Sequence, residues 1–329
     1  MKKITYILFF LLIAAGSVKV TAQSVTYRIT DDDPYDIKNF SLAIDPLFCD
    51  INAQNAFSAG WGLRADYLLG KSLQFNFDFR TAYATTGYNP DNENNRNFFY
   101  TEGGLGIVLS HKEKRKNVAI VLSSTQSGNT RTTISIAGGV PATIRKMVMF
   151  HGGVYSMTNA IKFSNLSDSL TYFENGSDKL MLKDTAISNH TSGSTENGYG
   201  GVASQAIFAG FNFKRIVQLY VDVDGWGTRS NRRYTDFFID GIFSPVLTLK
   251  NFTTNNKEYK VTSKDKRLFG WRMGWIYRDP YNQGVSLRFE FGQRPDLMLA
   301  SNTKMTGFFC MFTWGMYIPL KVGGLYQKD

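Results

Sequence analysis

"KSLQFNFDFR", residues 71–80, has Leu or Phe at every second position and a polar or charged residue between them. Successive side chains of a β-strand point to opposite faces, so this period predicts a strand with one apolar and one polar face. The polar face carries Gln74, Asn76, Asp78 and Arg80. Strands of water-soluble sandwiches usually have about 5–6 residues. The length of this pattern therefore suggests a different environment.

The same alternation recurs in residues 57–67, 217–224 and 285–292. A tilted strand needs about 9–11 residues to cross a bilayer, and these stretches have about that length. In a transmembrane barrel one strand face contacts lipid and the other a polar interior. Aromatic residues make up 15% of the chain. These patterns predict an all-β protein, a transmembrane antiparallel β-barrel.

The N-terminus has the features of a secretory signal peptide. Lys2 and Lys3 precede an apolar run over residues 4–15, and Val20-Thr21-Ala22 forms a small-residue cleavage pattern. The run is shorter than the roughly 20 residues of a spanning helix. We therefore expect a signal peptide at 1–22, a periplasmic N-terminal tail at 23–37 and the barrel over 38–329.

The spacing of the patterns predicts about fourteen strands, with twelve or sixteen left open. Tight connections occur at 69–72, 213–215 and 278–283, and long polar ones at 86–97 and 158–197. Outer-membrane barrels have short periplasmic turns and long external loops. If the chain starts in the periplasm, tight turns must follow even-numbered strands, and this requires a strand within 246–263. We place the others at 38–49, 56–68, 72–85, 97–110, 117–124, 131–138, 145–157, 199–213, 215–227, 232–244, 266–278, 283–294 and 305–318.

The signal peptide, the alternating strands, the aromatic strand ends and the alternation of short and long connections resemble those of Gram-negative outer-membrane β-barrel proteins. The stretch "RRYTDFFIDGIFSP", residues 232–245, resembles a strand of uncharacterised barrels in that group. The resemblance covers residues 38–318. It implies localisation in the outer membrane of a Gram-negative bacterium, with outer-membrane lipid as a partner.

The polar faces of the predicted strands supply the candidate interior residues. Charges there either line a polar channel or pair across strands and hold the barrel together. We expect Arg272 directly opposite Glu290, and Arg64 diagonal to Asp78, from the positions of the tight turns. The candidate interior residues are Arg64, Asp66, Asp78, Arg80, Glu102, Asp222, Asp224, Arg272, Arg288 and Glu290.

Cys49 and Cys310 fall in the first and last predicted strands, which are neighbours in a closed barrel. Strict alternation puts Cys49 on the inward face and Cys310 on the outward face. This disagreement is evidence against a disulfide without excluding one.

Catalytic, metal and nucleic-acid signatures are not found in the sequence. The histidines are His111, His151 and His190, and no nucleophile motif accompanies them. We expect no enzyme, cofactor or metal site, and a hydrolase at the barrel rim would depend on His151 or His190. The net charge of +10 is concentrated only in the run 111–116, which predicts a solvated turn and no nucleic-acid binding.

Two functions remain open. The first is a passive outer-membrane channel or transporter for small polar or amphipathic solutes. The alternative is a non-conducting structural or docking subunit of an envelope assembly, which would contact a protein partner through the long external loop 158–197.

Overall fold

The computed structural model describes most of the chain as β-strands. The described residues are 25–35, 38–52, 56–69, 72–86, 97–163, 171–175, 178–181, 198–250, 252–254, 257–263, 266–279, 284–297 and 307–322. The predicted signal peptide lies outside them. No helix in this part of the chain is long and apolar enough to cross a membrane.

The chain divides into two compact units. Unit 1 comprises residues 1–32, 115–142 and 219–231, and unit 2 comprises 33–114, 143–218 and 232–329. Strands β5, β8, β11 and β12 contribute residues to both units.

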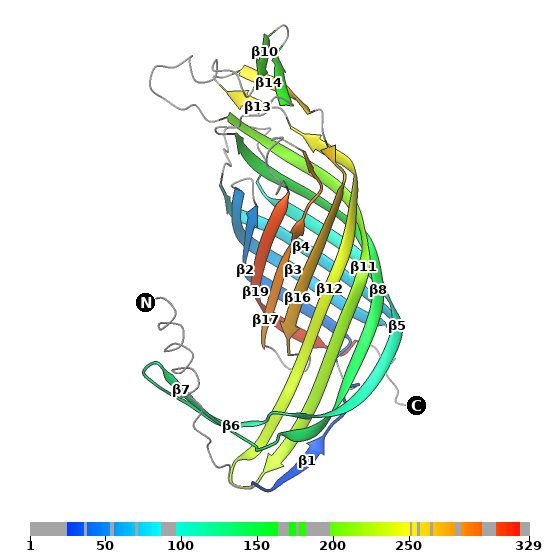
Figure 1. Cartoon of the computed structure of the whole chain (residues 1–329), viewed down its shortest axis with the longest axis vertical. Helices are drawn as coiled ribbons and strands as arrows, with labels where there is room; N and C mark the ends of the chain where they lie inside the picture. Colours follow the sequence, from blue (N-terminus) through cyan, green and yellow to red (C-terminus); the bar gives the residue numbers. More distant parts are fainter. Residues whose placement is uncertain are drawn as a thin grey trace, which may run out of the picture. The chain divides into compact units, whose positions relative to one another are not determined.

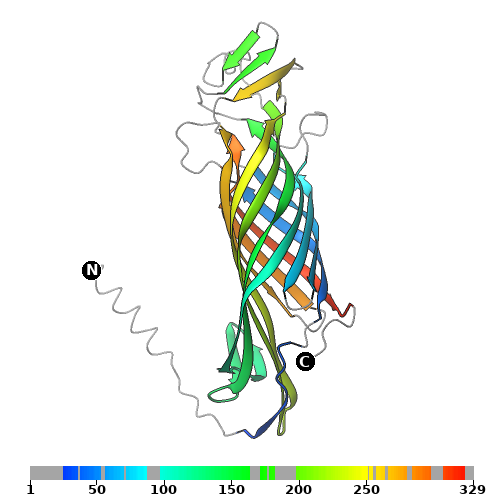
Figure 2. The same cartoon turned by 90° about the vertical axis from the view of Figure 1, so that its right-hand side faces the viewer.

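Unit 2 contains a closed antiparallel barrel (Figures 1 and 2), which confirms the all-β antiparallel barrel of the predicted fold class. That its strands cross a membrane stays a prediction. Ten described strands close the ring, in the order β8-β11-β12-β16-β17-β19-β2-β3-β4-β5, with β5 next to β8. Their bounds are β2 Phe40–Asn52, β3 Ala56–Leu69, β4 Leu73–Thr85, β5 Phe99–Val118, β8 Val140–Phe163, β11 Gly198–Val223, β12 Gly227–Leu249, β16 Phe269–Arg278, β17 Gly284–Gln293 and β19 Phe308–Leu320.

The predicted count of fourteen strands differs from these ten in three places. The strands expected at 117–124 and 131–138 correspond to β6 (Val121–Ser127) and β7 (Thr130–Ser135), which form a separate two-stranded sheet. The strand expected within 246–263 is replaced by β13 (Phe252–Thr254) and β14 (Lys257–Ser263), which lie outside the ring.

The third difference is the connection expected at 213–215, which does not exist. β11 runs through these residues for 26 residues in all, far longer than the length that a bilayer requires. The basic pair Lys214-Arg215 gives the appearance of a turn in an otherwise alternating pattern. The turn lies instead at residues 224–226, where Gly225 takes a φ of 75° that favours glycine.

The predicted external loop 158–197 and the predicted strand region 246–263 together carry a second small sheet, here called the cap sheet. β9 (Thr171–Asn175) pairs with β10 (Asp178–Met181), and β14 pairs with both β9 and β13. β13 in turn pairs with β11, so the order is β10-β9-β14-β13-β11 (Figure 1). The predicted loop 158–197 therefore contains the end of β8 and a hairpin. Its other residues lie outside the described ranges.

Two of the three predicted tight connections lie where they were expected, between β3 and β4 and between β16 and β17, after the second and eighth strands of the barrel. The short connection between β11 and β12 follows the sixth strand, at residues 224–226 and not at 213–215. We call the end where β3 meets β4 and β16 meets β17 the turn end. The opposite end of the unit 2 strands, where β13 pairs with β11, is the cap end. A further pair, β15 (Lys266–Arg267) and β18 (Asp296–Leu297), forms a two-stranded sheet.

The outward faces of the barrel strands are apolar, and the inward faces are largely polar. A bulge between Asp45 and Phe48 shifts the alternation in β2, so both of these residues are fully buried although three positions separate them. Exposed outward residues include Ile44, Leu47, Phe57, Trp61, Phe75, Phe77, Leu105, Ile107, Phe150, Val154, Ile207, Phe211, Phe213, Phe237, Ile239, Trp271, Trp275, Val285, Phe289, Phe312, Trp314 and Met316.

Unit 1 has a small apolar core of its own. β1 (Tyr27–Asp31) pairs with residues 220–223 of β11, so part of the predicted N-terminal tail 23–37 is a strand. Its buried apolar side chains include Val118, Ile120, Leu122, Ile136, Val140, Leu219, Val221 and Val223.

Candidate functional site in the barrel interior

The inward face of the barrel carries as many basic as acidic side chains. Among the described residues of unit 2, eight Lys and Arg side chains and seven acids are buried, and Asp66 is half-buried. A buried charge without a partner is costly, so the stability of the interior depends on how these side chains are paired. The basic residues are Arg64, Arg80, Arg145, Lys214, Arg272, Arg278, Arg288 and Arg294. The acids are Asp45, Asp50, Asp66, Asp78, Glu102, Asp236, Asp240 and Glu290.

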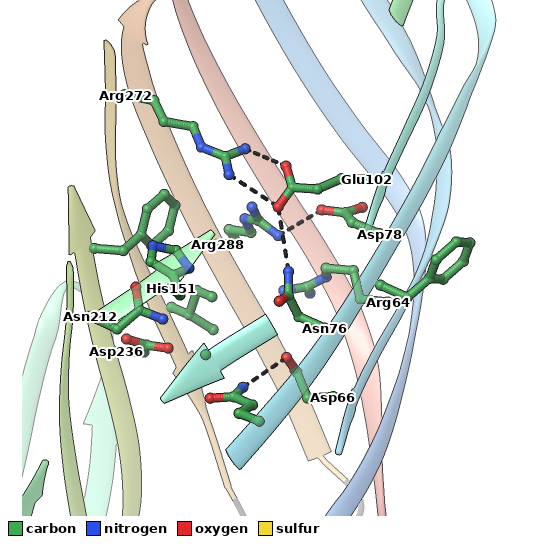
Figure 3. A pocket seen from close by; sticks show the side chains of 15 residues that line it. Arg64, Asp66, Asn76, Asp78, Glu102, His151, Asn212, Asp236, Arg272 and Arg288 are labelled. Carbon is green, nitrogen blue, oxygen red and sulfur yellow. Dashed lines mark hydrogen bonds and ion pairs between the residues drawn. The ribbon is translucent and has the colours of Figure 1, made fainter. Parts of the chain in front are cut away.

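Arg272 on β16 lies at the centre of the network. Its Nη1 donates to Glu102 Oε2 on β5 at 2.5 Å, and its Nε donates to Asp240 Oδ2 on β12 at 2.7 Å. Asp240 Oδ1 lies 2.5 Å from His151 Nε2 on β8. On the shorter way around the ring, β12, β11 and β8 separate β16 from β5. The Arg272–Glu102 pair therefore crosses the interior (Figure 3).

A second group of charges crosses from β17 to β4. Arg288 Nη1 donates to Asp78 Oδ2 at 2.7 Å, and Arg80 Nη1 lies 3.6 Å from Glu290 Oε2. Arg288 also contacts Glu290 on its own strand, and Arg80 contacts Asp78. These four side chains form a closed ring of alternating charge. β19, β2 and β3 separate the two strands, so this ring also spans the barrel.

A third crossing pair lies closer to the turn end. Arg278 Nη1 on β16 donates to Asp66 Oδ2 on β3 at 2.5 Å. The Arg278 guanidinium carbon lies 4.2 Å from the centroid of the Tyr234 ring and 5.0 Å from that of Tyr317. Two aromatic rings thus lie within cation–π distance of this guanidinium.

Three further interior ion pairs join strands that are closer around the ring. The Nε and Nη2 atoms of Arg64 donate to the two carboxylate oxygens of Asp45, at 2.6 and 2.7 Å. Nη2 also donates to Ser286 Oγ at 3.0 Å. Bidentate pairs of this kind fix geometry as well as charge. Two further pairs are Lys214–Asp236 at 2.5 Å and Arg294–Asp50 at 2.7 Å.

Two apolar layers lie along the strands on either side of the charged network. The layer near the turn end contains Leu68, Met147, Ile216 and Tyr234. The layer toward the cap end contains Phe48, Phe98, Tyr100, Tyr155, Met157, Ala206, Phe208 and Ile242. Side chains therefore occupy the interior in three layers, with the Arg272 and Arg288 pairs in the middle one. The Lys214, Arg278 and Arg294 pairs lie beside aromatic members of the two apolar layers, Tyr234 at the turn end and Phe98 at the cap end.

Two small cavities lie between these charged side chains in the described part of unit 2. One cavity of about 50 Å³ is bordered by residues such as Asn76, Glu102, His151, Asn212 and Arg272 (Figure 3). A second, of about 30 Å³, lies beside Asp66, Lys214 and Arg278. A water needs about 10–15 Å³ measured in this way. These two cavities are large enough for water molecules and too small for a larger solute.

Eight of the ten candidate interior residues lie in this network. Asp222 and Asp224 do not, because β11 continues beyond unit 2 and both belong to unit 1. Asp222 is exposed and is the register partner of Arg28 on β1. Asp224 is exposed in the turn that follows β11. The eight that lie in the network are Arg64, Asp66, Asp78, Arg80, Glu102, Arg272, Arg288 and Glu290.

The register across the two tight turns differs from the predicted register, so both predicted cross-strand relationships change. Arg272 is the register partner of Gly292, and Glu290 is opposite Gly274, so the expected Arg272–Glu290 pair is wrong by two positions. Arg64 is directly opposite Asp78 and not diagonal to it. In each case the centre of the turn lies at a slightly later residue than the sequence suggested.

Several interior charges were missed by the sequence reasoning. Asp236 and Asp240 alternate with outward Phe237 and Ile239, a signal that was present in the sequence. Lys214 was assigned to a turn that does not exist. Asp50 and Arg294 could not be found from alternation, because a bulge and a strand end precede them.

The histidines fall into different surroundings. His151 contacts Asp240, and its ring lies 5.7 Å from that of Phe208. His111 Nε2 lies 3.0 Å from the Tyr35 hydroxyl and accepts from Arg145 Nε at 2.8 Å. His190 lies outside the described residues.

The site defines a class of protein, a closed antiparallel β-barrel whose interior is filled by ion pairs. No family model matches the chain, and no curated protein matches it either. Among solved structures, the chain is similar to an anion-selective porin from Comamonas acidovorans, with 10% identity over 89% of this chain and 99% of the porin. The TM-score is 0.16, so this likeness carries no argument about function.

Proposed function

We propose that this protein is a non-conducting β-barrel of a bacterial outer membrane that serves as a docking subunit. The observation that carries the proposal is the set of ion pairs that cross the interior, above all Arg272–Glu102 and Arg288–Asp78. Side chains just fill an eight-stranded barrel, and sixteen strands leave an aqueous channel. A ten-stranded barrel filled by bulky Arg side chains lies close to the first case.

The outward face supports the location in a membrane. Exposed aliphatic and aromatic residues occupy the outward positions of all ten strands. Soluble monomers rarely expose continuous apolar patches larger than a few hundred Å². A closed sheet also leaves no unpaired edge in lipid, where each unsatisfied backbone group costs several kcal/mol.

The cap sheet supports a docking role. β10 is the last strand in its order, so one of its edges has no partner among the described strands. An open edge of this kind accepts a further strand from a binding partner. An envelope protein that adds a strand to β10 is the partner that this geometry fits, and the interior charges then have a structural role.

The alternative is the passive channel for small polar solutes. It requires the crossing pairs to separate, which would leave several charges buried without partners. The ion pairs and the two apolar layers therefore favour the docking subunit over the channel.

Site-specific photo-crosslinking in the cells that carry this protein tests the proposal. A photoreactive residue at Leu180 on β10 should give an adduct of defined mass with an envelope protein. The same residue at outward-facing Phe211 is the matched control and should crosslink to lipid. Recovery of the folded chain in the soluble fraction would contradict the membrane location. The absence of protein adducts along β10 and β14 would contradict the docking role.

A further inference from the structure

Three basic side chains lie close together on the outward face of the barrel at its turn end. Lys146 on β8 and Arg215 on β11 are register partners, so they face outward directly opposite one another. Thr235 Oγ1 on β12 donates to the Arg215 carbonyl oxygen at 3.5 Å. Arg233 precedes Thr235 by two positions and therefore shares its outward face. We call these three residues the basic triad.

The basic triad has no acidic partner in the described part of unit 2. β8 contains no Asp or Glu, and the one acid of β11, Asp222, belongs to unit 1. The acids of β12, Asp236 and Asp240, are buried on the inward face. The Nε of Arg215 is buried and has no hydrogen-bond partner among the described residues.

Like charges directly opposite one another destabilise a sheet. The Lys146–Arg215 arrangement is therefore unfavourable unless an anion lies between the two cations. Asp279, at the end of β16, could have supplied a carboxylate, but it lies 2.9 Å from Arg232 and is engaged there. The described acids of β11, β12 and the end of β16 therefore do not supply this charge, and an anion from outside the chain would supply it.

The triad lies where the apolar outward surface ends. On the same faces and toward the cap end, the next exposed side chains are Phe150, Phe213 and Phe237. The Arg233 guanidinium carbon lies 5.8 Å from the centroid of the Tyr277 ring. Aromatic rings and long basic side chains gather at the level of lipid headgroups, because their stems stay in the apolar region and their tips reach the polar one.

We infer that the basic triad binds the phosphate group of an anionic phospholipid in the leaflet at the turn end. Lys146 and Arg215 hold the phosphodiester between them, and Arg233 contacts it from β12. Charge-assisted bonds to phosphate oxygens are among the stronger hydrogen bonds in proteins. The inference rests on the proposed membrane location, since a lipid headgroup is present at this level only in a bilayer.

Native mass spectrometry of the full chain in nanodiscs tests the inference. The nanodiscs contain equal amounts of phosphatidylglycerol and phosphatidylcholine, and the lipids that stay bound after release are counted. The test variant is Lys146→Gln/Arg215→Gln. The matched control is Lys116→Gln/Arg131→Gln, which removes one Lys and one Arg from exposed positions of unit 1.

The wild-type chain and the control should retain phosphatidylglycerol in preference to phosphatidylcholine. In the test variant, the ratio of retained phosphatidylglycerol to retained phosphatidylcholine should fall about thirtyfold. The reason is that each of the two removed cations contributes about 1 kcal/mol near an anionic surface. Soluble glycerol phosphate should not displace the lipid. Displacement by glycerol phosphate, equal retention by the two double variants, or no preference in the wild type would overturn the inference while the barrel stays inserted. A chain that fails to insert would overturn the inference and the membrane location together.

Discussion

Arg288 on β17 contacts Asp78 on β4, although β19, β2 and β3 lie between these strands around the barrel. A contact between strands so far apart in the ring is made only across the interior. Arg272–Glu102 and Arg278–Asp66 repeat this relationship at other levels of the barrel. The sheet is therefore braced from within by ion pairs as well as closed by its backbone hydrogen bonds.

Loss of one central brace should destabilise the barrel strongly. Arg272→Met leaves Glu102 buried without a charge partner, and removal of one member of a buried pair costs about 3–5 kcal/mol. Urea unfolding of the barrel in detergent, followed by its heat-modifiable mobility in gels, measures this loss. Lys114→Met, at an exposed position of β5, is the control and should change stability by less than about 0.5 kcal/mol.

The double variant Arg272→Met/Glu102→Gln separates the lost pair from lost packing. It should recover part of the stability, because no charge is then left buried at Glu102. If the double variant lost as much unfolding free energy as the two single variants together, the two residues would not be coupled. That result would refute a stabilising role for the Arg272–Glu102 pair.

Two neighbouring glycines should respond in opposite ways to the addition of one methyl group. A Cβ on Gly153 would overlap the Gly103 carbonyl oxygen and lie 2.7 Å from Gly104 Cα, whereas a Cβ on Gly103 would meet no atom within 4 Å. Gly153→Ala should cost about 1–3 kcal/mol by overpacking. Gly103→Ala should be neutral or stabilising, since glycine weakens strands. Equal stabilities for the two variants, in the same unfolding assay, would refute the close approach of β5 and β8.

Both cysteines should react in the folded barrel. The bulge in β2 puts Cys49 opposite Phe312, so Cys49 and Cys310 are diagonal neighbours on the outward face, and both thiols are free. Diagonal residues are about 7–8 Å apart, which is too far for a disulfide. A lipid-soluble maleimide should label both thiols before unfolding, and a buried Ser58→Cys control should not react. Labelling of Cys49 only after unfolding would contradict the bulge.

Alternation in the sequence predicts the fold class because a barrel strand repeats the same two environments along its length. It also places eight of the ten candidate residues in the interior network. Asp222 and Asp224 show the same alternation for a different reason, because they continue β11 into the apolar core of unit 1. Alternation alone does not distinguish a strand in lipid from a strand on another core.

The cross-barrel partners could not be predicted from the sequence. Arg272 pairs with Glu102 because the order and tilt of the strands around the barrel place β16 and β5 on opposite sides of the interior. A local sequence pattern contains no information on the strand order or the strand tilt. Turn centres were misjudged by about one residue, which was enough to replace Glu290 by Gly292 opposite Arg272. The bulge at Pro46 and Leu47 reversed the faces assigned to the rest of β2.

Single-channel recording in a planar bilayer tests the central claim most directly. The protein without the predicted signal peptide, residues 23–329, is first shown to be folded by its heat-modifiable mobility. It is then added to the bilayer, and the current is recorded under an applied voltage. A barrel closed by the Arg272–Glu102 and Arg288–Asp78 braces should give no steady conductance steps. Uniform, long-lived steps from the folded wild-type protein would contradict the claim and favour the solute channel.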